Sequence, residues 1–266
     1  MSKFTDQQYL KSNQYKESSN LEARIELHRR FSTNPYGWCR WVFDALLKLP
    51  ANARILELGC GPGLVWKENA GRIPAGWNII LSDLSPGMLD AAWRNLVVTG
   101  RAFKFEEIDA QSIPYPEEAF DAVIANHMLY HVPDRPKAIA EIQHVLKPAG
   151  HLFATTIGKN HLKEMADWLR QVSVGNTFES FGNPFTLENG LEQLQQFFSH
   201  VAVFRYPDEL HVTEVEPIID FIRSSIHAKE LSEEGLKRLQ QELERQLASN
   251  GEIFIRKDSG LFEALK

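Results

Sequence analysis

The stretch that decides the fold is residues 56–63, which read LELGCGPG. Its apolar start ends in three alternating glycines, Gly59, Gly61 and Gly63, and a helical pattern begins immediately afterwards. Glycine lets a strand turn sharply and lets the backbone approach a ligand closely, because no side chain fills that space. The stretch therefore predicts a strand, a turn that binds a ligand, and a helix. Glycines of this kind also occur in tight turns that bind nothing.

Two acidic residues make a ligand the stronger interpretation. Glu57 lies beside the turn, and Asp83 ends the next predicted strand, at the position where an acidic group suits the two ribose hydroxyls of an adenosine. A dinucleotide site has the spacing G-x-G-x-x-G and rests a pyrophosphate on the helix N-terminus. Here the third glycine comes one residue early, and Glu57 would repel phosphate. The pattern favours a nucleoside with a cationic tail over NAD.

Strand and helix patterns alternate on both sides of this turn. Such alternation predicts an α/β fold with a parallel sheet that is covered by helices on both faces. The strands are expected at residues 55–58, 77–82, 103–108, 120–125 and 151–157, and the helices between them at 64–70, 86–97 and 135–146.

The flanking segments divide the rest of the chain. Residues 1–50 are expected to form an N-terminal arm, flexible or conditionally ordered up to about residue 20, followed by helices from residue 21 and over 38–49. The core is expected over residues 51–212, a helical insertion or lid over 213–250, and a terminal hairpin that completes the core sheet over 251–266. Later elements are expected as helices at 161–174, 187–198, 217–225 and 232–248 and a strand at 201–206.

Composition excludes several classes of protein. The 266 residues carry 35 Asp and Glu against 29 Lys and Arg, a net charge of −6, with no basic block, which argues against a general nucleic-acid binder but leaves a local patch open. No apolar run reaches the roughly 18–20 residues of a membrane span, and the polar N-terminus lacks the apolar core of a secretory signal. Two cysteines, Cys39 and Cys60, fit a reducing compartment. We therefore expect a cytoplasmic protein.

Five short motifs carry a family resemblance. Residues 57–63, 82–88, 109–110, 120–123 and 146–150 resemble the ordered motifs of class I S-adenosylmethionine-dependent methyltransferases, and within them the small-molecule group called type 11. The resemblance covers about residues 51–157, and Ala149 departs from it where many relatives have glycine. It implies a Rossmann-like, seven-stranded sheet with an antiparallel last strand. It also implies S-adenosyl-L-methionine as cofactor, S-adenosyl-L-homocysteine as product and a small-molecule acceptor.

The resemblance also assigns residues to the cofactor. The glycines would pass beneath its methionine part, Asp83 would hold the ribose, Asp109 would reach the adenine amino group, and an arginine of the arm would pair with the methionine carboxylate. Asp109 could instead cap a helix, Leu84 and Met88 could be core residues, and Arg24 could lie on a solvated helix face. The full set is Glu57, Gly59, Cys60, Gly61, Gly63, Asp83, Leu84, Met88, Asp109, Ala110, Asn126, Tyr15 and Arg24.

Catalytic candidates follow the fourth predicted strand. His127 and His131 are four residues apart, so on a helix they would share a face, and either is a candidate base or an orienting or packing group. A metal site is disfavoured, because the chain lacks the glutamate of H-E-x-x-H and an obvious third ligand. Aromatic residues that could line an acceptor pocket, although most suit a core better, are Trp38, Trp41, Phe178, Phe181, Phe185 and Phe197.

Two other functions stay open beside small-molecule methylation. One is methylation of RNA or protein, for which neither a basic groove nor an appended recognition domain is evident. The other is a protein that binds or senses the cofactor without catalysis, which the glycine and acidic positions do not distinguish from an enzyme. The methyl acceptor and the oligomeric state do not follow from the sequence.

Overall fold

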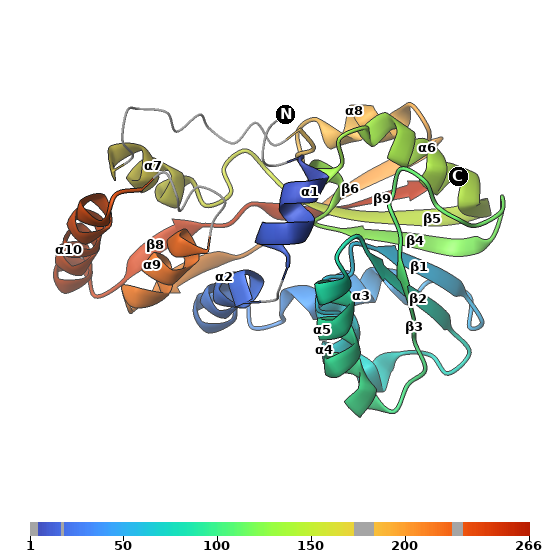
Figure 1. The fold of residues 1–266 in the computed structure, drawn as a ribbon, viewed down its shortest axis with the longest axis horizontal. Coiled ribbons are helices and arrows are strands. Elements are labelled where there is room, and N and C mark those ends of the chain that lie inside the picture. Colours follow the sequence, from blue (N-terminus) through green and yellow to red (C-terminus); the bar gives the residue numbers. More distant parts are fainter. Residues whose placement is uncertain (1–4, 17–18, 173–183, 225–230) are drawn as a thin grey trace.

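Seven strands form the central sheet of the computed structural model, which describes residues 5–16, 19–172, 184–224 and 231–266 (Figure 1). The strand order is β3–β2–β1–β4–β5–β9–β6. Strands β1 to β5 pair in parallel, and β9 is antiparallel to both of its neighbours, β5 and β6. The predicted Rossmann-like sheet is thus confirmed. The bounds are β1 (Arg54–Leu58), β2 (Asn78–Asp83), β3 (Lys104–Glu107), β4 (Phe120–Asn126), β5 (Leu146–Ile157), β6 (His200–Tyr206) and β9 (Ser259–Leu265).

Helices cover both faces of the sheet because alternate residues of each strand point to opposite sides. Ile55 of β1 packs into a core with α3, α4 and α5, whereas its neighbour Leu56 packs into a second core on the α6 face. Figure 1 shows α3, α4 and α5 beside β1, β2 and β3, and α6 and α8 above β5. Their bounds are α3 (Trp38–Leu46), α4 (Leu64–Glu68), α5 (Pro86–Leu96), α6 (Arg135–Val145) and α8 (Gly190–Gln195).

A third apolar cluster holds together a separate unit, which we call the cap. Its buried side chains come from three separate stretches of the chain and include Leu27, Trp168, Leu210, Ile219 and Leu243. The predicted insertion at 213–250 supplies only part of it. The cap consists of α2 (Ser19–Phe31), α7 (Lys163–Val172), α9 (Glu216–Arg223), α10 (Glu233–Asn250) and a two-stranded antiparallel sheet of β7 (Glu209–Val212) and β8 (Ile253–Arg256).

The predicted terminal hairpin is wrong. β8 and β9 do not pair with each other: β8 pairs with β7 in the cap, and β9 lies between β5 and β6 in the core. The polar turn between them has the composition of a hairpin turn, but each strand finds its partners earlier in the chain. The chain therefore passes from the cap into the core at residues 257–258.

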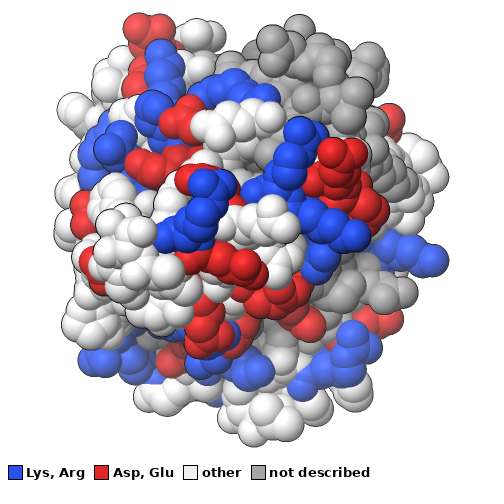
Figure 2. Space-filling view, turned by 90° about the vertical axis from the view of Figure 1, so that its left-hand side faces the viewer, with Lys and Arg blue, Asp and Glu red and all other residues white. Residues whose placement is uncertain are grey.

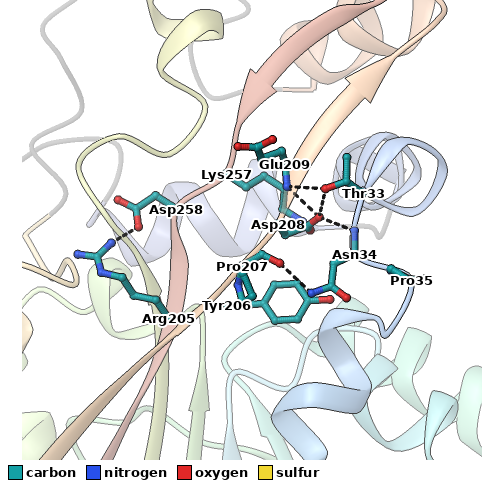
Figure 3. Close-up of a pocket in the computed structure, with 10 residues that line it drawn as sticks. All are labelled: Thr33, Asn34, Pro35, Arg205, Tyr206, Pro207, Asp208, Glu209, Lys257 and Asp258. Atoms are coloured by element: carbon teal, nitrogen blue, oxygen red, sulfur yellow. Dashed lines mark hydrogen bonds and ion pairs between the residues drawn. The ribbon is translucent and has the colours of Figure 1, made fainter.

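A buried ion pair marks this passage from cap to core (Figure 3). The ammonium of Lys257 pairs with the carboxylate of Asp208, and their side chains are only 8% and 1% exposed. The backbone N–H of Asn34 also donates to Asp208 Oδ1, at 3.0 Å. Burial alone would raise the pKa of Asp208, but the hydrogen bonds from Lys257 and Ser32 outweigh it and lower that pKa. The pair ties together the loop after α2, the start of β7 and the end of β8.

The described part of the N-terminal arm is helical. It forms α1 (Gln7–Tyr9) and a π-helical turn (Leu10–Gln14), where the sequence predicts a flexible or conditionally ordered segment. Gln7 donates to Asp109 of the core, and Gln14 donates to the carbonyl of Ser224 at the end of α9. The arm thus bridges the core and the cap, and α1 lies between them in Figure 1.

Candidate functional site

A cavity of about 1,620 Å³ is lined by residues of the core, the arm and the cap. It lies at the carboxyl ends of β1, β2 and β4, where the strand order reverses and where α/β sheets bind ligands. Pockets for single small ligands typically measure about 300–1,000 Å³, so this one has room for two ligands side by side.

The glycine turn forms one wall of the cavity. All three glycines have positive φ, +67° at Gly59, +52° at Gly61 and +71° at Gly63, a conformation that other residues rarely adopt. A Cβ on Gly59 would lie 2.8 Å from the Cβ of Met128, whereas one on Gly61 would meet only Leu21, at 3.7 Å. Gly59 and Gly61 line the cavity with Cys60, but Gly63 does not; it precedes α4 and packs against α5.

Asp83 is held rigidly at the end of β2. Its Oδ2 accepts the backbone N–H of Gly61 at 3.0 Å, and its Oδ1 accepts that of Ser85 at 2.9 Å. Burial raises the pKa of Asp83 to about 6, although the hydrogen bonds from Ser85 and Gly61 act in the opposite direction. The carboxylate therefore fixes the glycine turn through the N–H of Gly61. It also lines the cavity, where its remaining lone pairs can accept hydrogen bonds from ligand hydroxyls.

Glu57 is the most deeply buried acid of the site. Only 2% of it is exposed, and its carboxylate accepts hydrogen bonds from the indole N–H of Trp66 and, at 2.9 Å, from the amide of Asn126. Burial raises its pKa to about 7, the two hydrogen bonds lower it, and the nearby charge of Asp83 raises it again. Since Glu57 also lines the cavity, it suits a ligand that brings positive charge or hydrogen-bond donors.

The raised pKa of Glu57 predicts that the ligand-free protein loses stability as the pH rises. Between the ordinary value of 4.5 and the folded value of about 7, the folded protein binds the proton more tightly than the unfolded chain. Stability is therefore greatest below about pH 4.5 for this group and declines through pH 7. We expect Glu57→Gln to abolish about 2.5 kcal/mol of the loss of unfolding free energy between pH 5 and pH 8. Urea unfolding of both proteins at the two pH values checks this, and an identical loss in both would contradict it.

Asp109, after β3, lies at the other end of the cavity and contacts the arm. Its Oδ2 accepts from the side chain of Gln7 at 3.1 Å, and its Oδ1 accepts the backbone N–H of Gln111 at 2.9 Å. Burial raises the pKa of Asp109, but the hydrogen bonds from Gln111 and Gln7 lower it more, so the net shift is downward. Ala110, Leu84 and Met88 line the same end, and Met88 also belongs to the buried core.

The arm brings Tyr15 to the cavity, and α2 of the cap brings Arg24. The hydroxyl of Tyr15 lies 3.0 Å from Nε2 of His131, and the carbonyl of Tyr15 accepts from the hydroxyl of Ser85 at 2.7 Å. The guanidinium of Arg24 lies 5.6 Å from the centre of the Tyr15 ring. The structure thus brings these two residues into the cavity with the predicted cofactor residues of the core.

The prediction that His127 and His131 share a helix face is wrong, although both line the cavity. β4 ends at Asn126, His127 has a positive φ of 49°, and a short 3₁₀ helix (Leu129–His131) follows. The backbone N–H of His127 donates to Oγ1 of Thr155 at 3.0 Å, which holds this unusual conformation in place. The two side chains therefore have different neighbours. His131 contacts Tyr15 of the arm, and His127 packs on Trp38 with 5.2 Å between ring centres.

Sequence reasoning missed two other histidines of the cavity wall, His28 of α2 and His161 after β5. Neither belongs to a local motif, and only the folded chain brings them together. No cluster of three or more His, Cys, Asp or Glu residues suited to a metal occurs in the described part of the chain. Of the aromatic candidates, Trp38 lines the cavity and Phe185 is buried in the core, while Phe178 and Phe181 lie outside the described residues.

Comparison with known proteins gives a consistent picture. Residues 56–154 match the Methyltransf_11 family, described as a methyltransferase domain. The chain is 36% identical over 111 residues to the ubiquinone biosynthesis O-methyltransferase of Ralstonia nicotianae, which covers 41% of this chain and 45% of the relative. It is also 36% identical over 118 residues to the demethylmenaquinone methyltransferase of Thermus thermophilus, covering 43% and 51%. The matches span about half the length of these two relatives.

Solved structures resemble the whole chain in fold. The crystal structure of the [4+2]-cyclase SpnF aligns with a TM-score of 0.60 at 19% identity and covers 98% of this chain and 96% of its own. That likeness includes the regions outside residues 56–154, so the arm and the cap belong to a fold seen before. Because the identity is low, it shows the fold and not the reaction.

Proposed function

Residues 56–154 belong to the Methyltransf_11 family of methyltransferase domains, and from this premise we propose that the protein transfers a methyl group from S-adenosylmethionine to a small-molecule acceptor. The observation that carries the proposal is the cavity itself. It places the open side of the Gly59–Gly61 turn, the Asp83 carboxylate and the Asp109 carboxylate along one wall, and it has room for a second ligand.

The residues fit the chemistry of the cofactor part by part. Asp83 presents acceptor lone pairs to the two ribose hydroxyls, and Asp109, with Ala110 beside it, faces the adenine. The glycine turn has no side chains to obstruct the methionine part, and Glu57 with Asn126 offers carboxylate and amide groups near its ammonium. Arg24 would pair with the methionine carboxylate, and its position over the ring of Tyr15 on the cavity surface supports this role.

Bound S-adenosylmethionine supplies a methyl carbon already activated by a positive sulfur. The chain's own residues then need to align the acceptor for in-line attack, exclude water and accommodate the loss of positive charge. The arm and the cap enclose the cavity on the sides that the core sheet leaves open. We propose that His127 and His131, which line the cavity beside the predicted cofactor residues, help to orient the acceptor.

A small-molecule acceptor fits the surface better than a nucleic acid. Figure 2 shows the face that carries the cap, where Lys, Arg, Asp and Glu side chains of the described residues are intermixed. A phosphate backbone laid on this face would meet carboxylates as often as cations. A cytoplasmic location is also part of the proposal, supported by the two free cysteines, Cys39 and Cys60. No helix in the described residues is long and apolar enough to cross a membrane.

Thermal unfolding with candidate ligands tests the proposal. We expect S-adenosylmethionine and S-adenosylhomocysteine to raise the melting temperature in a concentration-dependent way, because a ligand that binds only the folded state stabilises it. We expect NAD to have no effect, because Glu57 and the early third glycine disfavour a pyrophosphate. A rise with NAD alone would exclude the methyltransferase function.

The alternative is a cofactor-binding protein that does not transfer the methyl group. The glycine turn and Asp83 account for cofactor binding alone, so they are equally consistent with this alternative. Incubation with methyl-labelled S-adenosylmethionine and a metabolite extract distinguishes the two. A methyltransferase transfers label to an extract component, and an Asp83→Ala variant does not. Binding of the cofactor without any label transfer would favour the alternative.

A further inference from the structure

Two histidines from distant parts of the chain form a pair on the cavity wall. His28 of α2 and His161 after β5 have ring centres 6.1 Å apart and ring planes inclined by 33°. The backbone N–H of Asp258 donates to Nδ1 of His161 at 3.1 Å. When Nδ1 accepts, the proton of a neutral imidazole is on Nε2. His161 therefore offers a hydrogen-bond donor.

His28 offers the complementary group in the tautomer that carries its proton on Nε2, because its Nδ1 is then a hydrogen-bond acceptor. Its Nδ1 is buried and has no hydrogen-bond partner among the described residues. A buried acceptor that is left unsatisfied costs about 1–3 kcal/mol, and a ligand that donates to it removes that cost. Burial is also the main reason why the pKa of His28 is lowered to about 3 and that of His161 falls well below its ordinary value. Both rings are therefore neutral at pH 7.

The surroundings of the pair are largely apolar. Phe221 of α9 meets His28 edge-on with 6.1 Å between ring centres, and Met165 and Leu169 of α7 line the same cavity. Lys257, at the junction of the core and the cap, carries a positive charge near the two histidines. Its charge is balanced by the carboxylate of Asp208, with which it forms an ion pair (Figure 3). Arg24, the other cation near His28, lies over the ring of Tyr15.

We propose that His28 and His161 bind the hydroxyl group of a largely apolar methyl acceptor, so that the reaction is an O-methylation. This inference rests on the proposed methyltransferase function and deepens it. A hydroxyl both donates and accepts, so it satisfies His28 Nδ1 and His161 Nε2–H at once. A carboxylate cannot donate, and an ammonium cannot accept. The spacing of the rings suits one oxygen between them, since O–H···N and N–H···O bonds each span about 2.7–3.0 Å.

The histidine pair also provides a group that receives the proton of the acceptor hydroxyl. As the acceptor oxygen forms its bond to the methyl carbon, the carbon–sulfur bond breaks and its electron pair stays on sulfur. The O–H bond breaks in the same process, and the proton passes to Nδ1 of His28. His28 can receive it despite its lowered basicity, because an oxygen that gains a methyl group becomes a much stronger acid than an imidazolium. His161 keeps its proton and holds the oxygen in line.

Binding of a matched pair of probes tests the inference without relying on turnover. The probes are 4-methylphenol and 4-methylanisole, which differ by the methyl group on oxygen, added to histidine-labelled (¹⁵N) protein saturated with S-adenosylhomocysteine. We expect 4-methylphenol to shift the Nδ1 resonance of His28 and to bind about fivefold more tightly than 4-methylanisole, the worth of one hydrogen bond. Dissociation constants come from the titration of the imidazole resonances.

Variants of one position separate hydrogen bonding from packing. His28→Phe keeps a ring but no acceptor, so we expect it to abolish the preference for 4-methylphenol, whereas His28→Asn keeps an acceptor near Nδ1 and should retain part of it. His200→Gln, at an exposed position of β6, is the matched control and should change nothing. Equal binding of the two probes, or an unchanged preference in His28→Phe, overturns the inference. Failure of the wild type to bind S-adenosylhomocysteine instead overturns the proposed function.

Discussion

Replacing Asp83 by asparagine should weaken the binding of S-adenosylhomocysteine on the order of 100-fold. The carboxylate accepts two backbone N–H groups and retains lone pairs for hydroxyl donors. An asparagine keeps one oxygen, so its NH₂ group must face one of the backbone donors or the ribose. Hydrogen bonds to a charged partner contribute about 1.5–3 kcal/mol each, so the loss of one of them towards the ligand weakens binding by about 10- to 150-fold. Isothermal titration calorimetry measures the change directly.

The matched control is Asp90→Asn, an exposed aspartate on α5. It changes the net charge of the protein by the same amount and should leave the affinity within about twofold, because exposed charges contribute little. The melting temperature of each ligand-free variant shows whether the glycine turn has kept its structure. An affinity of Asp83→Asn within threefold of wild type, in a protein that still folds, would mean that the ribose does not lie at Asp83.

The proposed cofactor site could be predicted from the sequence because its residues end neighbouring parallel strands. Glu57, Asp83 and Asn126 stand at the carboxyl ends of β1, β2 and β4, and such ends meet at one edge of a parallel sheet. Residues that end strands in the sequence can therefore be predicted to lie close together in the folded protein. The same pattern places Asp109 after β3, at the far end of the same cavity.

The histidine pair shows where sequence reasoning stops. His28 and His161 lie in separate helical and loop segments, and no local spacing connects them. Their proximity depends on the cap, which is assembled from three stretches of the chain around one apolar cluster. The paired strands β7 and β8 are four residues each, and their pairing is non-local. For the same reason, the turn at 257–260 looks like a hairpin in the sequence and is not one.

The joint between the cap and the core gives the largest expected effect on stability. Replacing Lys257 by methionine should destabilise the protein by about 3–5 kcal/mol, because it leaves the carboxylate of Asp208 buried without its cation. That side chain is only 1% exposed, and its remaining partners are hydroxyl and backbone donors such as those of Ser32 and Asn34. Urea unfolding at pH 7 measures the loss.

Lys163→Met is the control for the loss of a cation. Lys163 also pairs with an aspartate, Asp167, at 2.6 Å, but its side chain is 48% exposed and that of its partner 36%. Exposed pairs of this kind contribute about 0.3–0.5 kcal/mol, so the two substitutions should differ by several kcal/mol although each removes one ion pair. The double variant Lys257→Met with Asp208→Asn should recover part of the loss, because it removes the unpaired charge. If Lys257→Met costs no more than Lys163→Met, then water reaches Asp208 and the joint is not held by a buried ion pair.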